Sequence, residues 1–138
     1  MKRLCILLAV MVVVVAAPLF GAHEALAEIL TGTALNDTLY GTEGKDYLKG
    51  RAGDDYLDAG GGNDTIEGGR GDDRIIPGEG DDVVLAGAGN DRIYARDAAS
   101  VDVIDCGGGF DQVETIHRDD ITKSNCERAL GPLKGNID

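Results

Sequence analysis

Residues 41–58 read Gly-Thr-Glu-Gly-Lys-Asp-Tyr-Leu-Lys and then Gly-Arg-Ala-Gly-Asp-Asp-Tyr-Leu-Asp. The two nine-residue segments share glycine at positions one and four, aspartate at position six, tyrosine at position seven and leucine at position eight. Self-similarity at a fixed short period is the signature of a repeat architecture, in which each unit packs only on its neighbours. This stretch therefore predicts a solenoid.

The nine-residue period continues on both sides of this stretch. Further units begin at residues 59, 68, 77 and 86, a weaker unit begins at residue 32, an eleven-residue unit spans 95–105, and a last regular unit spans 106–114. Position six is aspartate in all nine units: Asp37, Asp46, Asp55, Asp64, Asp73, Asp82, Asp91, Asp102 and Asp111. Position eight is always aliphatic: Leu39, Leu48, Leu57, Ile66, Ile75, Val84, Ile93, Ile104 and Val113.

The order of residue types within a unit predicts a turn followed by a strand. Glycines at positions one, two and four permit positive φ angles, so the first six residues can form a tight turn. The last three residues suffice for a short strand whose middle, aliphatic side chain points inward. Two units then make one coil of 18 residues. We expect an all-β fold, a parallel β-roll (β-solenoid) of about four to five coils over residues 28–114, with a short C-terminal cap at 115–138.

Stacked coils bring the aspartates together. Residue i lies beside residue i+18 at the strand spacing of about 4.8 Å. Asp55, Asp73 and Asp91 therefore form one row, while Asp46, Asp64 and Asp82 form another row on the opposite edge. Carboxylates at this distance repel one another unless a cation lies between them. The spacing predicts cation sites between consecutive coils.

Residues 32–114 resemble the RTX, or haemolysin-type, calcium-binding repeat proteins, whose nonapeptide is G-G-x-G-x-D-x-U-x with U aliphatic. The units that begin at residues 59 and 68 match most closely, with Gly60-Gly61-Gly62-Asn63-Asp64 and Gly68-Gly69-Arg70-Gly71-Asp72-Asp73. The resemblance implies a calcium-binding β-roll. Calcium accepts six to eight oxygen ligands, including backbone carbonyls, whereas magnesium demands shorter bonds and stricter geometry.

The candidate calcium ligands follow from this pattern. They are the nine position-six aspartates, from Asp37 to Asp111, and the carbonyl oxygens of the position-four glycines Gly44, Gly53, Gly62, Gly71, Gly80 and Gly89. Neighbouring aspartates leave at most seven gaps for ions, and we expect four or five well-formed sites because the first and eighth units depart from the pattern. Asp54, Asp72 and Asp81, at position five, are expected to add negative field rather than direct bonds to the ion.

The balance of charge and apolar surface predicts that folding depends on calcium. The chain has a formal net charge of -12 and only small aliphatic side chains for its core, so the stacked acids oppose compaction until metal neutralises them. Two alternatives stay open: a permanently disordered acidic linker, and a solenoid that folds without metal. The first does not explain the regular aliphatic position eight.

Residues 1–27 have the pattern of a secretory signal peptide. Lys2 and Arg3 precede an apolar run, and Ala25-Leu26-Ala27 supplies the small residues of a cleavage site. Cleavage is expected after Ala27 or after Ala22. An uncleaved anchor is the alternative, but residues 4–20 are shorter than the roughly 20 residues that span a bilayer core. We expect a secreted, extracellular protein with no membrane association after cleavage.

Two cysteines, Cys106 and Cys126, remain after such cleavage. Export to an oxidising compartment favours a disulfide between them, which would fasten the C-terminal cap to the last coil. Two reduced thiols are the alternative.

The composition argues against nucleic-acid binding and against catalysis. Phosphate recognition needs clustered Lys and Arg, which an acidic chain lacks. His23-Glu24-Ala25-Leu26-Ala27 lacks the second histidine of a zinc-protease motif, and no G-x-S-x-G sequence occurs. We therefore expect a calcium-binding module and no enzyme. The alternative roles are an adhesion or envelope-matrix element that contacts a cell-surface or extracellular polymer, and an accessory module of a secreted hydrolase.

Overall fold

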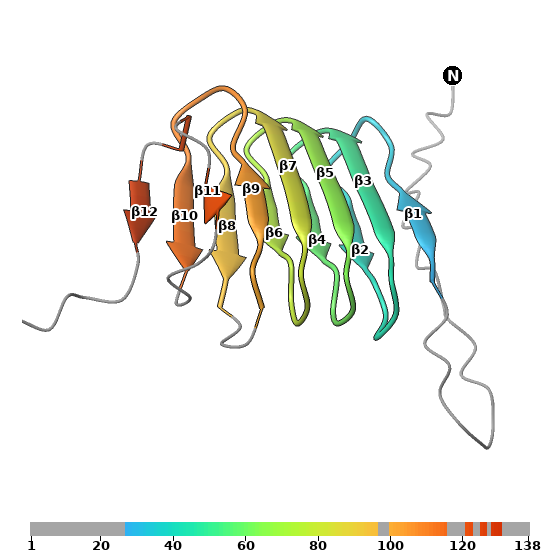
Figure 1. The fold of residues 1–138 in the computed structure, drawn as a ribbon. Coiled ribbons are helices and arrows are strands. Elements are labelled where there is room, and N and C mark those ends of the chain that lie inside the picture. Colours follow the sequence, from blue (N-terminus) through green and yellow to red (C-terminus); the bar gives the residue numbers. More distant parts are fainter. Residues whose placement is uncertain (1–26, 97–99, 116–120, 123–124, 127, 131–138) are drawn as a thin grey trace, which may run out of the picture.

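The computed structural model describes residues 27–96, 100–115, 121–122, 125–126 and 128–130, and it shows a parallel β-solenoid built from two sheets (Figure 1). The predicted signal peptide lies outside the described residues, apart from Ala27. The strands are β1 (Ile29–Thr31), β2 (Thr38–Tyr40), β3 (Tyr47–Ala52), β4 (Tyr56–Asp58), β5 (Thr65–Arg70), β6 (Arg74–Ile76), β7 (Val83–Ala88), β8 (Arg92–Ala95), β9 (Val103–Asp105), β10 (Gln112–Thr115), β11 (Ile121–Thr122) and β12 (Arg128–Leu130). Across the described ranges, no helix occurs that could cross a bilayer.

Odd-numbered strands form one sheet, in the order β1-β3-β5-β7-β9-β11, and even-numbered strands form the other, in the order β2-β4-β6-β8-β10-β12. All pairs are parallel, and Leu48 pairs with Ile66, which pairs with Val84. The offset of 18 residues confirms the predicted coil. The offset from Val84 to Ile104 is 20, because the eleven-residue unit carries two extra residues. The register is kept on both sides of this unit, so the insertion leaves the rows of core side chains aligned.

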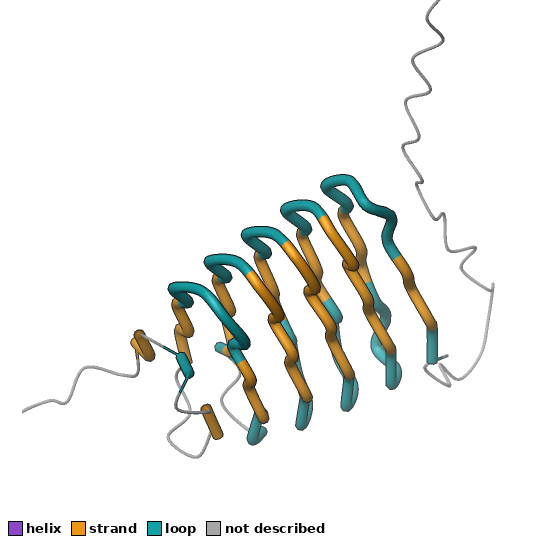
Figure 2. Tube along the Cα trace, turned by 90° about the horizontal axis from the view of Figure 1, so that it is seen from above, coloured by secondary structure: helices purple, strands orange, loops and turns teal. Residues whose placement is uncertain are grey.

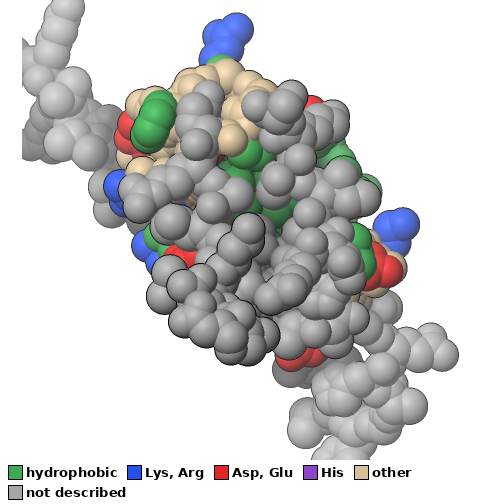
Figure 3. Space-filling model, turned by 60° about the vertical axis from the view of Figure 1, so that its left-hand side comes forward, with side chains coloured by type: hydrophobic (Ala, Val, Ile, Leu, Met, Phe, Trp, Pro, Cys, Tyr) green, Lys and Arg blue, Asp and Glu red, His purple; other side chains and the backbone are tan. Residues whose placement is uncertain are grey.

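The core is a narrow column between the two sheets, filled by position-eight side chains. Seven of them are completely buried: Leu48, Leu57, Ile66, Ile75, Val84, Ile104 and Val113. Small residues at position one, such as Ala59 and Ala86, are also fully buried and complete the core. A space-filling view from the C-terminal side shows hydrophobic side chains toward the centre and charged ones around the outline (Figure 3). The inward position-eight and outward position-seven side chains confirm the strand alternation read from the sequence.

One sheet has longer strands than the sequence predicts. Strands β3, β5 and β7 have six residues each instead of three. The first residues of the following turn also pair in register, as Arg51 does with Gly69 and Ala52 with Arg70. The turn on this edge therefore begins as a continuation of the sheet, and its first residues pair with the neighbouring coil.

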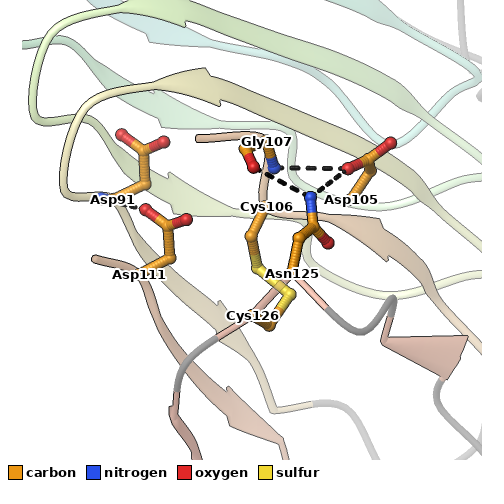
Figure 4. Close-up of a disulfide and its surroundings, with 7 residues drawn as sticks. All are labelled: Asp91, Asp105, Cys106, Gly107, Asp111, Asn125 and Cys126. Atoms are coloured by element: carbon orange, nitrogen blue, oxygen red, sulfur yellow. Dashed lines mark hydrogen bonds between the residues drawn. A yellow bond between two sulfur atoms is a disulfide. The ribbon is translucent and has the colours of Figure 1, made fainter. Parts of the chain in front are cut away.

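The end of the chain adds one strand to each sheet. β11 pairs with β9, and β12 pairs with β10. A disulfide joins Cys106 to Cys126 with their Cα atoms 5.3 Å apart, which confirms the predicted bridge (Figure 4). The amide of Asn125 donates to Asp105 Oδ1 at 2.8 Å and to the carbonyl of Gly107 at 3.0 Å. Together these contacts attach the segment after residue 114 to the last regular coil.

Removing the disulfide should destabilise this end of the protein. The double variant Cys106→Ala/Cys126→Ser frees a loop that spans 20 residues in sequence, and we expect a loss of about 3 kcal/mol in the free energy of unfolding from loop-closure entropy. Denaturant unfolding in saturating calcium measures the difference. Wild-type protein under reducing conditions serves as the control and should show the same loss. Equal stability of the oxidised wild type and the double variant would contradict a structural role.

Candidate metal centre

The six-residue turns stack along the two edges of the solenoid, as Figure 2 shows in teal on either side of the strands. One edge carries the turns that end at Asp46, Asp64, Asp82 and Asp102. The other edge carries the turns that end at Asp37, Asp55, Asp73, Asp91 and Asp111. The structure thus places the nine predicted aspartates in two continuous rows.

Each row is held together by the aspartates themselves. The backbone N–H of Asp55 donates to Oδ1 of Asp73 at 2.8 Å, and that of Asp73 donates to Oδ1 of Asp91 at the same distance. The same contact links every consecutive pair in both rows: Asp37 to Asp55, Asp46 to Asp64, Asp64 to Asp82, Asp82 to Asp102 and Asp91 to Asp111. Figure 4 shows the last pair, with the two carboxylates stacked on adjacent turns. One carboxylate oxygen of each later aspartate is therefore satisfied by the protein.

The second carboxylate oxygen is not satisfied in the interior turns. Oδ2 of Asp55, Asp64, Asp73 and Asp91 is buried and accepts no hydrogen bond, and these side chains are at most 3% exposed. Leaving a buried acceptor without a partner costs on the order of 1–3 kcal/mol, and more when it carries charge. Such an arrangement calls for a cation beside these oxygens.

The electrostatics of the rows agree with this requirement. Burial raises the pKa of Asp64 to about 6, that of Asp73 to about 7 and that of Asp91 to about 6. Neighbouring carboxylates of the same row raise the pKa further, while the N–H bond from the preceding aspartate lowers it. In the absence of a counter-ion, the interior of each row thus disfavours the charged form.

Backbone carbonyls supply the other oxygen atoms. The carbonyl oxygens of Gly53, Gly62, Gly71 and Gly89 accept no backbone hydrogen bond from the described residues. They point along the stack, since a Cβ added to Gly71 would overlap the carbonyl oxygen of Gly53. In the described part of the chain, no three His, Cys, Asp or Glu side chains converge to hold a metal by themselves. A cation between two turns must therefore combine carboxylate with carbonyl oxygens, a donor set that suits calcium.

The turns owe their shape to positive φ angles at positions two and four. Gly60 and Gly62 have φ angles of 94° and 115°, and Gly78 and Gly80 have 102° and 121°. Arg51, at position two of its turn, has a φ of 86° and is the only non-glycine residue with positive φ among the described residues. An L-residue in this region costs roughly 1–2 kcal/mol.

Replacing Arg51 by glycine should therefore stabilise the protein. We expect the Arg51→Gly variant to gain about 1 kcal/mol, because the relief of strain exceeds the added freedom of the unfolded chain. Thermal or denaturant unfolding in calcium measures the change. Arg70→Gly is the matched control, since Arg70 is exposed, lies at position three and has no positive φ. A loss of stability in both variants would contradict strain at Arg51.

The structure assigns position five a role that the sequence reasoning missed. Asp54, Asp72 and Asp81 were expected only to add negative field, but their Oδ1 atoms accept backbone N–H bonds from the next coil, as Asp54 does from Asp72 at 2.9 Å. Asn36, Asn63 and Asn90 do the same. The regular Asn or Asp at position five was the available signal, because both side chains offer an acceptor of similar shape. These exposed side chains form a second ladder outside the buried rows.

Three of the predicted ligands differ from the rest. Asp37 and Asp46, in the first two turns, accept hydrogen bonds at Oδ2 from threonine. Gly44 lies in the second of these turns and lacks the positive φ that Gly53, Gly62, Gly71, Gly80 and Gly89 have. The structure therefore separates the candidate ligands into an N-terminal pair of turns and an interior set.

Comparison with known proteins supports the same conclusion. The family described as RTX calcium-binding nonapeptide repeat (4 copies) matches the overlapping segments 31–66, 50–84, 59–93, 67–100 and 76–113. No curated protein and no solved structure matches the chain. The matched segments together cover more than half of the sequence and coincide with the stacked turns described above. The chain belongs to the RTX calcium-binding nonapeptide repeat family.

Proposed function

We propose that this protein is a secreted calcium-binding β-roll that folds when calcium binds between its stacked Gly/Asp turns. The observation that carries the proposal is the set of buried, unpaired Oδ2 atoms on Asp55, Asp64, Asp73 and Asp91. Each of these aspartates ends a turn whose position-four carbonyl accepts no backbone hydrogen bond from the described residues. Bound calcium would supply the positive charge that these oxygens lack.

Calcium-dependent folding follows from what the structure asks of the carboxylates. Ordering a residue costs about 1–2 kcal/mol of backbone entropy. The thin core of this solenoid offers only one large aliphatic side chain per nine residues to offset that cost. The buried rows add like-charge repulsion to that cost. Metal binding that exists only in the folded state contributes its binding free energy to folding. Folding outside the cell, where calcium is available, fits the signal-like segment 1–27 and the Cys106–Cys126 disulfide.

Calorimetric titration of the protein without residues 1–27 tests the proposal. We expect saturable binding of several calcium ions, coupled to a gain of strand signal in circular dichroism. Magnesium at the same concentration should bind more weakly, because it demands near-octahedral geometry and shorter bonds. Absence of saturable calcium binding at millimolar concentration would refute the proposal.

The raised pKa values predict that the stability of the metal-free fold and the calcium affinity both depend on pH. The pKa of Asp73 is about 7 in the metal-free fold, against about 3.9 for an unfolded aspartate. The metal-free folded state therefore binds more protons than the unfolded state between pH 7 and 4, so its stability should rise as the pH falls through this window. Calcium affinity should fall over the same window, because protons compete for the ligand oxygens. Circular dichroism in chelator at pH 8 and pH 5 tests the first effect, and a strand signal unchanged or weaker at pH 5 would contradict it.

A second candidate function is attachment to an anionic extracellular polymer, favoured by the outer face of the even-numbered sheet. Arg74 lies over the rings of Tyr56 and Tyr94, with 4.6 Å from its guanidinium carbon to the centroid of Tyr94. Arg92 pairs in register with Arg74 on the adjacent strand. Neither arginine forms an ion pair within the described residues. On an acidic protein, this face offers two adjacent guanidinium groups to carboxylate or sulfate.

Binding to an immobilised acidic polysaccharide at physiological salt tests this second candidate. The double variant Arg74→Gln/Arg92→Gln should lose binding, whereas Lys45→Gln should retain it, because Lys45 lies in a turn away from the sheet face. Equal retention of all three proteins on the acidic polysaccharide would show that the two arginines do not bind it and would remove this candidate.

A further inference from the structure

The described turns fall into two conformations. In an open turn, positions two and four both have positive φ. Six turns are open, and they end at Asp55, Asp64, Asp73, Asp82, Asp91 and Asp111. In a closed turn, neither position has positive φ; the turns that end at Asp37 and Asp46 are closed. The closed turns are the first two of the solenoid, one on each edge.

Threonine at position two holds each closed turn. The backbone N–H of Thr42 donates to Oδ2 of Asp46 at 2.5 Å, and its hydroxyl donates to the same oxygen at 3.0 Å. The backbone N–H and hydroxyl of Thr33 donate to Oδ2 of Asp37 at 2.6 and 2.9 Å. The oxygen that is buried and unpaired in Asp55, Asp64, Asp73 and Asp91 is thus doubly hydrogen-bonded in the first two turns.

Threonine also explains why these turns stay closed. A β-branched residue is strongly disfavoured at positive φ, so position two keeps the conformation in which its N–H faces the aspartate. Two donors then occupy Oδ2, and their positively polarised hydrogens would repel a cation at this oxygen. A closed turn can pack on its neighbour, but its Oδ2 atom is already hydrogen-bonded and is not free for metal.

We propose that calcium binds only between two open turns, and that the closed turns of Thr33 and Thr42 form a built-in, metal-free N-terminal cap. This inference rests on the proposed calcium binding and specifies where it occurs. Four interfaces lie between two open turns in the described part of the chain: Asp55 with Asp73, Asp73 with Asp91, Asp91 with Asp111, and Asp64 with Asp82. The interface between Asp82 and Asp102 includes residues 97–99, which lie outside the described ranges, and it is not assigned.

The sequence offers a single substitution that should convert a closed turn into an open one. Residues 41–46 read Gly-Thr-Glu-Gly-Lys-Asp, which differs from the open-turn pattern Gly-Gly-x-Gly-x-Asp only at Thr42. Residues 32–37 read Gly-Thr-Ala-Leu-Asn-Asp and differ at both Thr33 and Leu35. Thr42→Gly should therefore open its turn, whereas Thr33→Gly alone should leave Leu35 at position four and keep the first turn incomplete.

Native mass spectrometry of the mature protein in calcium counts the bound ions. Relative to wild type, Thr42→Gly should gain one ion, between Asp46 and Asp64, and Thr33→Gly should gain none. The double variant Thr33→Gly/Leu35→Gly should gain one ion, between Asp37 and Asp55, and provides an independent test if Thr42→Gly does not fold.

The outcomes separate this inference from the proposed function. Equal ion counts for wild type, Thr42→Gly and the double variant, or an added ion in Thr33→Gly, would overturn the metal-free cap while calcium binding stands. An absence of bound calcium in every protein would overturn both. Gains of one, none and one ion, respectively, would support the cap.

Discussion

Removal of calcium by a chelator is expected to abolish most of the strand signal of this protein in far-ultraviolet circular dichroism. Eight of the nine position-six aspartates are buried in the folded state. The Oδ2 atoms of Asp55, Asp64, Asp73 and Asp91 have no hydrogen-bond partner. Without a counter-ion, each row must either bind protons or separate, and at pH 7.5 protons are scarce. Because the core of the described coils is a narrow column of apolar side chains, separation of the turns should unfold the coils.

Two controls make this result specific. Excess calcium after chelation should restore the signal, and magnesium in place of calcium should restore less of it. The measurement belongs at pH 7.5 or above, because acid should partly replace calcium by protonating the buried carboxylates. Equal strand content with calcium and with chelator at pH 7.5 would show that the solenoid folds without metal.

Replacement of Asp73 by asparagine should produce one of the largest effects of any single change in the rows. Asp73 lies at the middle of its row and faces two interfaces between open turns, one toward Asp55 and one toward Asp91. Asparagine keeps the size of the side chain and an acceptor oxygen for the N–H of Asp55, but it removes the charge that both ions would share. We expect loss of two bound ions and at least a tenfold rise in the calcium concentration at half-folding, which corresponds to about 1.4 kcal/mol.

Asp72→Asn is the matched control for this prediction. Asp72 precedes Asp73 in the chain, carries the same charge and is exposed at position five, where its Oδ1 accepts the N–H of Asn90 at 2.7 Å. Asparagine preserves that bond, so the calcium midpoint should change by less than about twofold, as for a screened surface charge. If the two variants shift the midpoint equally, net charge rather than a specific ligand governs folding.

In the metal-free state, Asp73→Asn should change the stability of the fold in the opposite direction. Burial raises the pKa of the Asp73 carboxyl to about 7, so in chelator at pH 8 the charged side chain destabilises the fold. The neutral amide should then make the metal-free protein more resistant to unfolding while it weakens calcium binding. A variant that is less stable under both conditions would indicate lost packing instead of lost metal ligation.

The periodic features of this fold were predictable from the sequence because each is set by residues nine or eighteen apart. Position eight predicted the core column, and the pairing of Leu48 with Ile66 confirmed the 18-residue coil. The two inserted residues in the eighth unit did not disturb the register, since Val84 still pairs with Ile104. Cys106 and Cys126 were predicted to join the cap to the last coil, and they do.

Positive φ at the turn glycines was predictable, but other features of the backbone within a turn were not. Whether the side chain of Thr42 faces solvent or its own aspartate depends on a φ angle that the period does not specify. The continuation of β3 into Arg51 and Ala52 likewise depends on hydrogen bonds to the next coil. The recurrence of Asn or Asp at position five, as at Asp54, Asp72 and Asn90, was visible in the sequence. Its role became clear only from the N–H groups that donate to these side chains in the structure.

The most direct test is a crystal structure of the calcium-loaded protein with anomalous diffraction data collected to locate calcium. We predict anomalous peaks inside the turns, at the interfaces of Asp55 with Asp73, Asp73 with Asp91, Asp91 with Asp111 and Asp64 with Asp82, each 2.3–2.6 Å from carboxylate and carbonyl oxygens. Calcium found only on exposed acids such as Asp54 and Asp72, with no peak between the stacked turns, would contradict ion binding as the basis of this fold.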